Sequence, residues 1–105
     1  MTETPLTWNQ ILVLSALETG ARYGLEVIQR TDLSSGTVYP VLRQLEARGM
    51  VEGSWESEGK AHAEGRPARR YYAATREGRT SLATARERVR ERQRALGLLP
   101  GTGGP

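Results

Sequence analysis

Apolar residues recur at helical spacing between Leu33 and Trp55, and this segment predicts more than any other part of the chain. It contains, in order, the start of a helix, one apolar face, a glycine stop and a strand. The apolar face is a narrow stripe, made up of Val38, Val41, Leu42 and Leu45. The pattern therefore predicts an amphipathic helix that buries one side and leaves the other in solvent.

Both ends of this predicted helix carry recognisable signals. Ser34 can act as N-cap, because its hydroxyl can accept a hydrogen bond from an amide of the first turn, and Gly49 stands where a left-handed C-cap is expected. Pro40 lies near the start, and the glycine at position 36 limits its crowding although an amide hydrogen bond is lost. The outward face has no acids and consists of Thr37, Pro40, Arg43, Gln44 and Ala47. Such a face can approach a DNA groove closely.

Two further helices are expected before this one. Thr7 and Gln10 have the spacing of a capping box, which predicts a helix from there to Gly20. Its apolar residues wrap most of the way round, whereas a helix facing one core needs only a stripe, so we expect one side to lie against another subunit. A second helix is expected over Tyr23–Arg30, with a tight turn at residues 31–33. Two helices joined in this way form a helix-turn-helix, whose second helix enters the major groove.

The rest of the chain predicts a wing and a last helix. Residues 51–56 and 69–73 are typical of strands, and residues 57–68 form a polar loop between them. Thr75 caps a helix that runs to about Leu96. The expected organisation is a flexible arm (1–6), a winged helix-turn-helix domain (7–74), a C-terminal dimerisation helix (75–96) and a disordered tail (97–105). The fold class is mainly α with a small β-wing.

Charge is distributed unevenly along the chain. The net charge is +3, but residues 1–59 hold 4 basic and 8 acidic residues (−4), and residues 60–105 hold 11 basic and 4 acidic ones (+7). This asymmetry favours a polyanionic partner, with a solvated basic helix as the alternative. The absence of cysteine excludes disulfides and thiolate metal sites and favours a cytoplasmic protein. Neither a membrane-spanning apolar run nor a signal peptide is expected.

The sequence lacks the residue combinations that are typical of catalytic sites. The chain has one histidine, no cysteine, no paired carboxylates in an apolar setting and no glycine loop followed by lysine. We therefore expect no enzyme, no metal site and no cofactor.

Three segments together resemble the PadR family of winged-helix transcriptional regulators. They are YGLEVI at 23–28, SSGTVYPVLRQLEARGMV at 34–51 and GRPARRYYAATREG at 65–78, and the resemblance extends over about residues 8–96. It implies a homodimeric repressor that binds a palindromic operator and is often released by a small molecule. The link between the second and third helices is shorter than in many members. The single C-terminal helix resembles the short branch of the family, which leaves an effector pocket to the dimer interface, where Trp8 is the candidate to contact a flat ligand; ordinary packing is the alternative.

The residues predicted to contact DNA lie on the third helix and on the wing. Hydroxyls at the N-terminal end of the helix can reach phosphates or base edges, and the helix dipole favours a phosphate there. Arg43 can reach a guanine or the backbone, and Arg66 is the wing residue best placed to follow a groove. The full set is Ser34, Ser35, Thr37, Tyr39, Arg43, Lys60, Arg66, Arg69 and Arg70. The alternative is that the serines only cap the helix, that Arg43 is solvated, and that Arg69 or Arg70 faces inward or pairs with an acid.

A dimer interface is expected between the last helix and the outer side of the first. Leu82, Val89 and Leu96 recur at seven-residue spacing, which makes a thin seam for pairing. The predicted interface consists of Trp8, Ile11, Leu14, Leu82, Ala85, Val89 and Leu96. A second DNA-facing helix, or a frayed one, is the rival interpretation of the last helix. The function expected from the residues and the resemblance is operator-specific repression, and the alternative is a winged-helix module that binds another protein.

Overall fold

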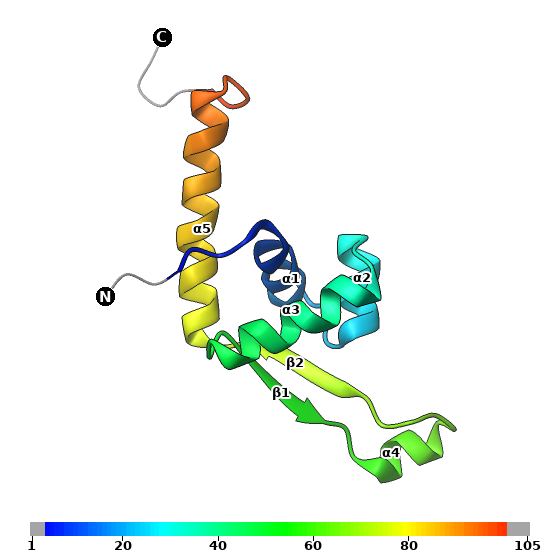
Figure 1. Cartoon of the computed structure of the whole chain (residues 1–105). Coiled ribbons are helices and arrows are strands. Elements are labelled where there is room, and N and C mark those ends of the chain that lie inside the picture. The colour runs from blue at the N-terminus through cyan, green and yellow to red at the C-terminus, as the bar shows by residue number, and fades with distance from the viewer. Residues whose placement is uncertain (1–3, 101–105) are drawn as a thin grey trace.

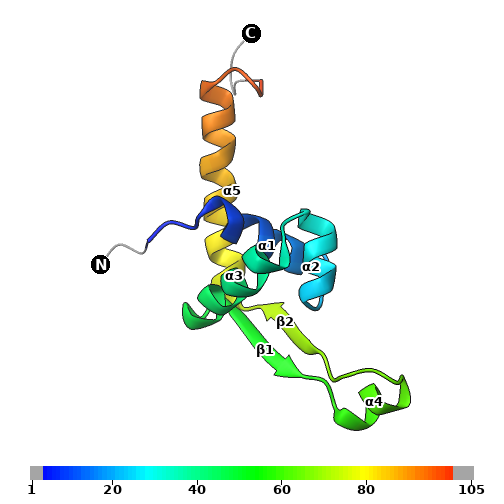
Figure 2. The same cartoon turned by 45° about the vertical axis from the view of Figure 1, so that its right-hand side comes forward.

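The computed structural model describes residues 4–100 and shows three helices packed together with two projecting elements (Figure 1). The order is α1 (Trp8–Glu18), α2 (Gly24–Thr31), α3 (Ser35–Ala47), β1 (Val51–Trp55), α4 (Glu58–Ala63), β2 (Arg70–Ala74) and α5 (Arg76–Ala95). Figures 1 and 2 both show α5 extending from the helical body on one side and β1, α4 and β2 projecting on another. The fold is mainly helical with a two-stranded wing, as the sequence predicted.

The core forms where the helices of the body meet the first half of α5. Its largest fully buried side chains are Leu14, Leu42, Leu45, Leu82, Val13, Val27 and Val38. The predicted stripe of α3 is confirmed, because its four apolar residues are all buried. Burying this stripe against α1 and α2 fixes the opposite face of α3 toward solvent.

The helix ends confirm most of the predicted caps. The Gln10 amide donates to Thr7 Oγ1 (3.1 Å) and the Thr7 amide to Gln10 Oε1 (3.0 Å), which completes the capping box of α1. Gly49 adopts a φ of +74° after α3, as a left-handed stop requires. The capping bond expected of Ser34 is wrong: its Oγ lies 3.2 Å from Thr37 Oγ1, and the two hydroxyls bond each other instead of an amide.

The wing pairs β1 and β2 in antiparallel register from Val51 opposite Ala74 to Trp55 opposite Arg70. The Tyr72 amide donates to Arg22 O (2.8 Å), so the base of the wing is attached to the segment before α2. The tip differs from the polar loop that was expected, because it contains the short helix α4. Ser57 caps this helix by accepting from the Lys60 amide (3.2 Å), and Ala61 is buried, so the tip has a packed side of its own.

The described parts of the predicted arm and tail make contacts with the rest of the fold. The Arg48 guanidinium donates to Thr4 O, and Leu6 packs against the core. After α5, the Leu98 amide donates to Gln93 O (2.8 Å) and Gly97 has a φ of +77°, which is a helix-ending turn. Residues 1–3 and 101–105 of the predicted arm and tail lie outside the described residues. No helix within residues 4–100 has the length and apolarity to cross a membrane.

Candidate nucleic-acid interface

The solvent-facing side of α3 presents small, aromatic and basic groups. Its exposed residues are Ser35, Gly36, Tyr39, Arg43, Gln44 and Ala47. Within α3, all of which the structure describes, the one acid is Glu46, which is half-buried and accepts from Arg70 Nη2 (2.9 Å). Burial and pairing therefore keep negative charge off this face, so it can approach phosphates without repulsion.

The basic and hydroxyl groups of α3 are available to a ligand. No carboxylate pairs with Arg43 within residues 4–100. Tyr39 is 41% exposed. At the N-terminal end, the exposed Ser34 and half-buried Thr37 hydroxyls lie together, where the partial positive charge of the helix favours a phosphate oxygen. The structure thus brings the five predicted residues of α3 to one end and one face of the helix.

Arg66 occupies a different position from the one predicted for it. Its guanidinium donates to Glu56 Oε1 (2.6 Å) and to Glu64 Oε2 (2.6 Å), and its side chain is only 20% exposed. A guanidinium held by two carboxylates has little donor capacity left for a phosphate. The prediction that Arg66 lies along a groove is therefore replaced by a structural role inside the wing.

Glu56 is the centre of this wing network. Its side chain is 2% exposed, and besides Arg66 it accepts from the Tyr71 hydroxyl (2.8 Å) and the Arg69 amide (3.4 Å). Hydrogen bonding from Arg66 lowers the pKa of the Glu56 carboxyl to about 2, although burial acts in the opposite direction. The same pairing raises the pKa of Arg66. Sequence reasoning missed Glu56 because its partners lie 10 to 15 residues away, across the tip.

The other two predicted wing arginines also face protein groups. Arg70 pairs with Glu46 and lies over the Trp55 ring, 5.4 Å from the ring centroid. The Arg69 guanidinium lies 4.3 Å from the centroid of Tyr23. The alternative that one of these arginines pairs with an acid is thus confirmed for Arg70. Neither Lys60, exposed on α4, nor Arg69 has a carboxylate partner within residues 4–100, but Arg69 is half-buried with its guanidinium against Tyr23.

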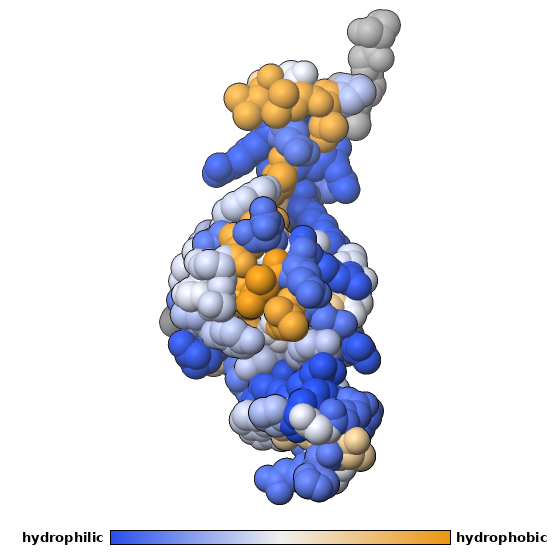
Figure 3. All heavy atoms as spheres, turned by 90° about the vertical axis from the view of Figure 1, so that its right-hand side faces the viewer, coloured by the Kyte–Doolittle hydropathy of each residue, from blue (hydrophilic) through white to orange (hydrophobic). Residues whose placement is uncertain are grey.

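The predicted dimer residues divide into exposed and buried groups. Trp8 is 60% and Leu96 75% exposed, and Ile11 and Val89 are half-buried. The expectation is corrected for three others, Leu14 (0% exposed), Leu82 (0%) and Ala85 (8%), whose surface is already covered within the single chain. Figure 3 shows an apolar area on the helical body and another at the far end of α5, where Leu96, Leu98 and Leu99 are exposed.

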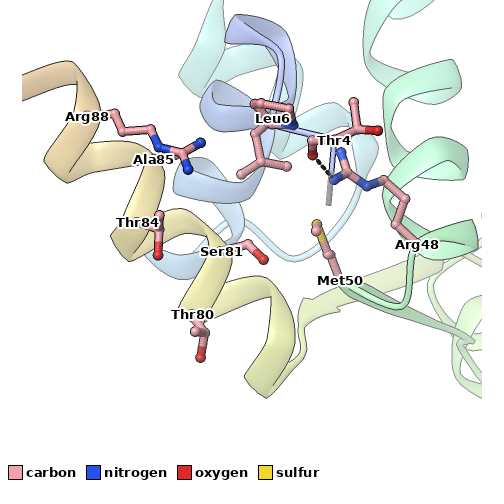
Figure 4. Close-up of a pocket in the computed structure, with 10 residues that line it drawn as sticks. Thr4, Leu6, Arg48, Met50, Thr80, Ser81, Thr84, Ala85 and Arg88 are labelled. Carbon is pink, nitrogen blue, oxygen red and sulfur yellow. Dashed lines mark hydrogen bonds between the residues drawn. The ribbon is translucent and has the colours of Figure 1, made fainter. Parts of the chain in front are cut away.

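Of the hollows that lie beside α5 in the described residues, two bear on function. One, of about 460 Å³, is lined by Pro5, Leu6, Trp8, Ile11, Ala85, Arg88, Val89 and Arg92. The other, of about 220 Å³, contains the hydroxyls of Thr80, Ser81 and Thr84, and Figure 4 shows Arg48 and Arg88 reaching toward it from opposite sides. Within residues 4–100, no three histidine or acidic side chains come close enough together to hold a metal ion.

The comparisons with known proteins agree with this geometry. The model of the transcriptional regulator PadR-like family matches residues 13–84. No curated protein matches the chain. Among solved structures, a PadR family regulator from Clostridium difficile R20291 is 24% identical, with a TM-score of 0.76 over 87% of this chain and 96% of that one.

Two other solved structures have similar folds. A PadR family regulator from Eggerthella lenta is 27% identical, with a TM-score of 0.70 over 90% of this chain and 82% of that one. BpsR of Bordetella bronchiseptica, whose DNA binding is regulated by 6-hydroxynicotinic acid, is 24% identical, with a TM-score of 0.73 over 95% and 72% of the two chains. With its family match over residues 13–84 and its winged helix-turn-helix, the chain belongs to the PadR-like family of transcriptional regulators, which are DNA-binding proteins and not enzymes.

Proposed function

We propose that the protein is a homodimeric repressor that inserts α3 of each subunit into the major groove of a palindromic operator. The observation that carries this proposal is the exposed face of α3, which presents Tyr39 and Arg43 and no exposed acid. A two-fold dimer presents two such helices, and a palindromic site matches that symmetry. The protein would act in the cytoplasm, associated with the nucleoid when bound.

The residues of α3 have different roles in this proposal. Arg43 reads a guanine edge, for which the guanidinium has matching donors. Ser34, Ser35 and Thr37 bind phosphate or base edges at the N-terminal end, and Tyr39 binds a phosphate. Lys60 adds a sequence-independent phosphate contact from the wing. With so few base-reading groups, DNA shape and deformability supply part of the discrimination.

The dimer in this proposal is formed by the distal half of α5 and the outer side of α1. This surface is lined by Trp8, Ile11, Val89 and Leu96. Exposed apolar residues grouped in one patch favour contact with a partner. A second copy of the chain is the partner that the two-fold operator requires.

Selection of binding sites from a random duplex library, followed by footprinting of the selected site, tests the proposal directly. We expect a palindrome with half-sites about one helical turn apart. Arg43→Ala should weaken binding to the selected site by about tenfold or more and relax specificity at one position of each half-site. Arg76→Ala removes the same charge from the first turn of α5, where the side chain is exposed and lies outside the proposed dimer surface, and should have a much smaller effect. A library in which no site is enriched would contradict operator binding and favour the protein-interaction alternative.

Repression is expected because the resemblance to the PadR family implies a repressor. A reporter gene placed behind the selected operator should fall in expression when the protein is produced. Expression that rises would overturn the repressor role but not DNA binding.

A small-molecule effector is proposed for the hollow beside Trp8 and Val89. Its apolar walls and the arginines at its edge suit a flat molecule with a negative group. The regulation of BpsR by an aromatic acid supports this part of the proposal. In a Trp55→Phe variant, Trp8 is the remaining tryptophan, so an effector that binds here should quench its fluorescence and release DNA at the same concentration. Quenching in a Trp8→Phe variant instead would place the ligand at the wing.

A further inference from the structure

Gly24 lies directly under the ring of Tyr39. A Cβ atom built on Gly24 would stand 2.4 Å from Tyr39 Cε1 and 2.6 Å from both Cζ and Oη. These separations are far below van der Waals contact, so the ring occupies the volume that any side chain at residue 24 needs. Gly24 is the first residue of α2 and does not have a positive φ, so close approach and not backbone conformation accounts for the glycine.

Tyr39 is in turn part of the exposed face of α3. It lies one turn after Ser35 and one turn before Arg43, so the three side chains follow each other along one side of the helix. The far end of the ring rests on Gly24 while 41% of the residue stays exposed. Whereas the Tyr71 hydroxyl donates to Glu56, the Tyr39 hydroxyl has no hydrogen-bond partner within residues 4–100.

We propose that Gly24 is a positioning residue for DNA binding, which holds the Tyr39 ring in the orientation that directs its hydroxyl at a phosphate of the operator. This inference rests on the proposed function, because it assumes that α3 contacts DNA. It gives α2 a role that its own side chains do not reveal. The backbone at the start of α2 supports the Tyr39 ring of α3.

The chemistry of the contact predicts how a substitution acts. The atoms that a new Cβ would meet are the far end of a side chain, which can rotate away, and not backbone. Gly24→Ala should therefore displace the ring and impair DNA binding more than it impairs folding. A phenol that donates to a charged phosphate contributes enough that its loss weakens binding by about tenfold.

A double-mutant cycle tests the inference with the full chain and the selected operator. We expect Gly24→Ala, Tyr39→Phe and Tyr39→Ala each to weaken binding by about tenfold. In the Tyr39→Ala background, where the displaced ring is absent, Gly24→Ala should cause no further loss. The control is Gln29→Ala, at an exposed position of the same helix α2, where binding should not change.

The remaining outcomes separate this inference from the proposed function. If the unchanged protein selects no operator, both are overturned. If it binds DNA and Gly24→Ala leaves the affinity unchanged, or weakens binding equally with and without the Tyr39 ring, only the positioning role is overturned. If Gly24→Ala fails to fold, urea denaturation of the Gly24→Ala/Tyr39→Ala protein decides: recovery of the fold supports the contact, and continued failure to fold contradicts it.

Discussion

At the scale of single residues, Glu56 determines the form of the wing tip. It is a buried carboxylate whose bonds come from Arg66, Tyr71 and the Arg69 amide, so it joins the end of β1 to the segment that returns into β2. Removing one partner of a buried ion pair leaves the other charge without compensation, which costs more than the pair contributes. The wing is therefore sensitive to this one side chain and to the pH that protonates it.

We predict that Glu56→Gln lowers the thermal midpoint at neutral pH and that the difference from the unchanged protein disappears in acid. Because the pKa of Glu56 is lower in the folded protein, its stabilising contribution is complete above about pH 4.5 and is lost as the pH falls toward 2. Thermal denaturation at a series of pH values measures this. Glu64→Gln, which removes a half-exposed partner of the same arginine, is the control and should have a smaller effect.

Gly78 provides a second test at the scale of a residue. A Cβ on it would stand 2.0 Å from Met50 O, which is backbone and cannot rotate away. Gly78→Ala should therefore push the first turn of α5 off the end of α3 and lower the free energy of unfolding by about 1–3 kcal/mol or more. Urea denaturation measures the change, and an unaltered midpoint would contradict this close approach.

At the scale of elements, the wing and α3 form one connected unit. Arg70 on β2 pairs with Glu46 on α3, and its guanidinium lies over the rings of Trp55 and Tyr72. The arginines of the wing thus fix its geometry, while the Lys60 side chain on α4 is exposed and is proposed to contact phosphate. The wing arginines look alike in the sequence, but their roles differ because the fold places a different partner against each of them.

This division predicts different results for two charge removals in the wing. Lys60→Ala should reduce the slope of log affinity against log salt by about one charge per subunit without changing stability. Arg66→Ala should instead increase amide hydrogen exchange in α4, because it releases Glu56 and Glu64. A salt slope unchanged by Lys60→Ala would remove α4 from the DNA interface.

At the scale of the whole molecule, only the first half of α5 packs against the rest of the chain. Its buried residues are Gly78, Leu82 and Ala85, all in its first half, and Figure 2 shows the second half extending beyond the helical body. The apolar residues of that second half lack an intramolecular partner sufficient to cover them. Association of two chains there would bury them and set the spacing of the two α3 helices.

We predict that Val89→Asp converts the proposed dimer to a monomer without unfolding the chain, because a carboxylate in an apolar interface costs several kcal/mol, on the order of 3 or more. Light scattering coupled to gel filtration reports the mass against the 11.6 kDa of one chain. Ala83→Asp, at an exposed position about 120° round the helix from Val89, should remain dimeric. Leu14→Asp should unfold the protein instead, since Leu14 is fully buried within one chain.

The sequence by itself determined the order of the main elements, because each depends on local signals. Helical spacing set the buried side of α3, the capping box began α1, Thr75 began α5, and glycine at residue 49 ended α3. The same pattern correctly predicted that the exposed face of α3 has no acidic residue. These features depend on residues that are close together in the sequence, so the sequence alone predicts them.

Only the tertiary structure decided which arginines are free and which apolar residues are covered. The buried partner of Arg66, Glu56, lies 10 residues away, and the partner of Arg70, Glu46, lies 24 residues away. Gly24 meets Tyr39 only after α2 and α3 pack. Leu82 and Val89 share a seven-residue spacing, yet one is in the core and the other is half-buried near the surface. Helical spacing determines which side of a helix a side chain occupies. Whether that side chain is buried depends on which distant segments pack against that side.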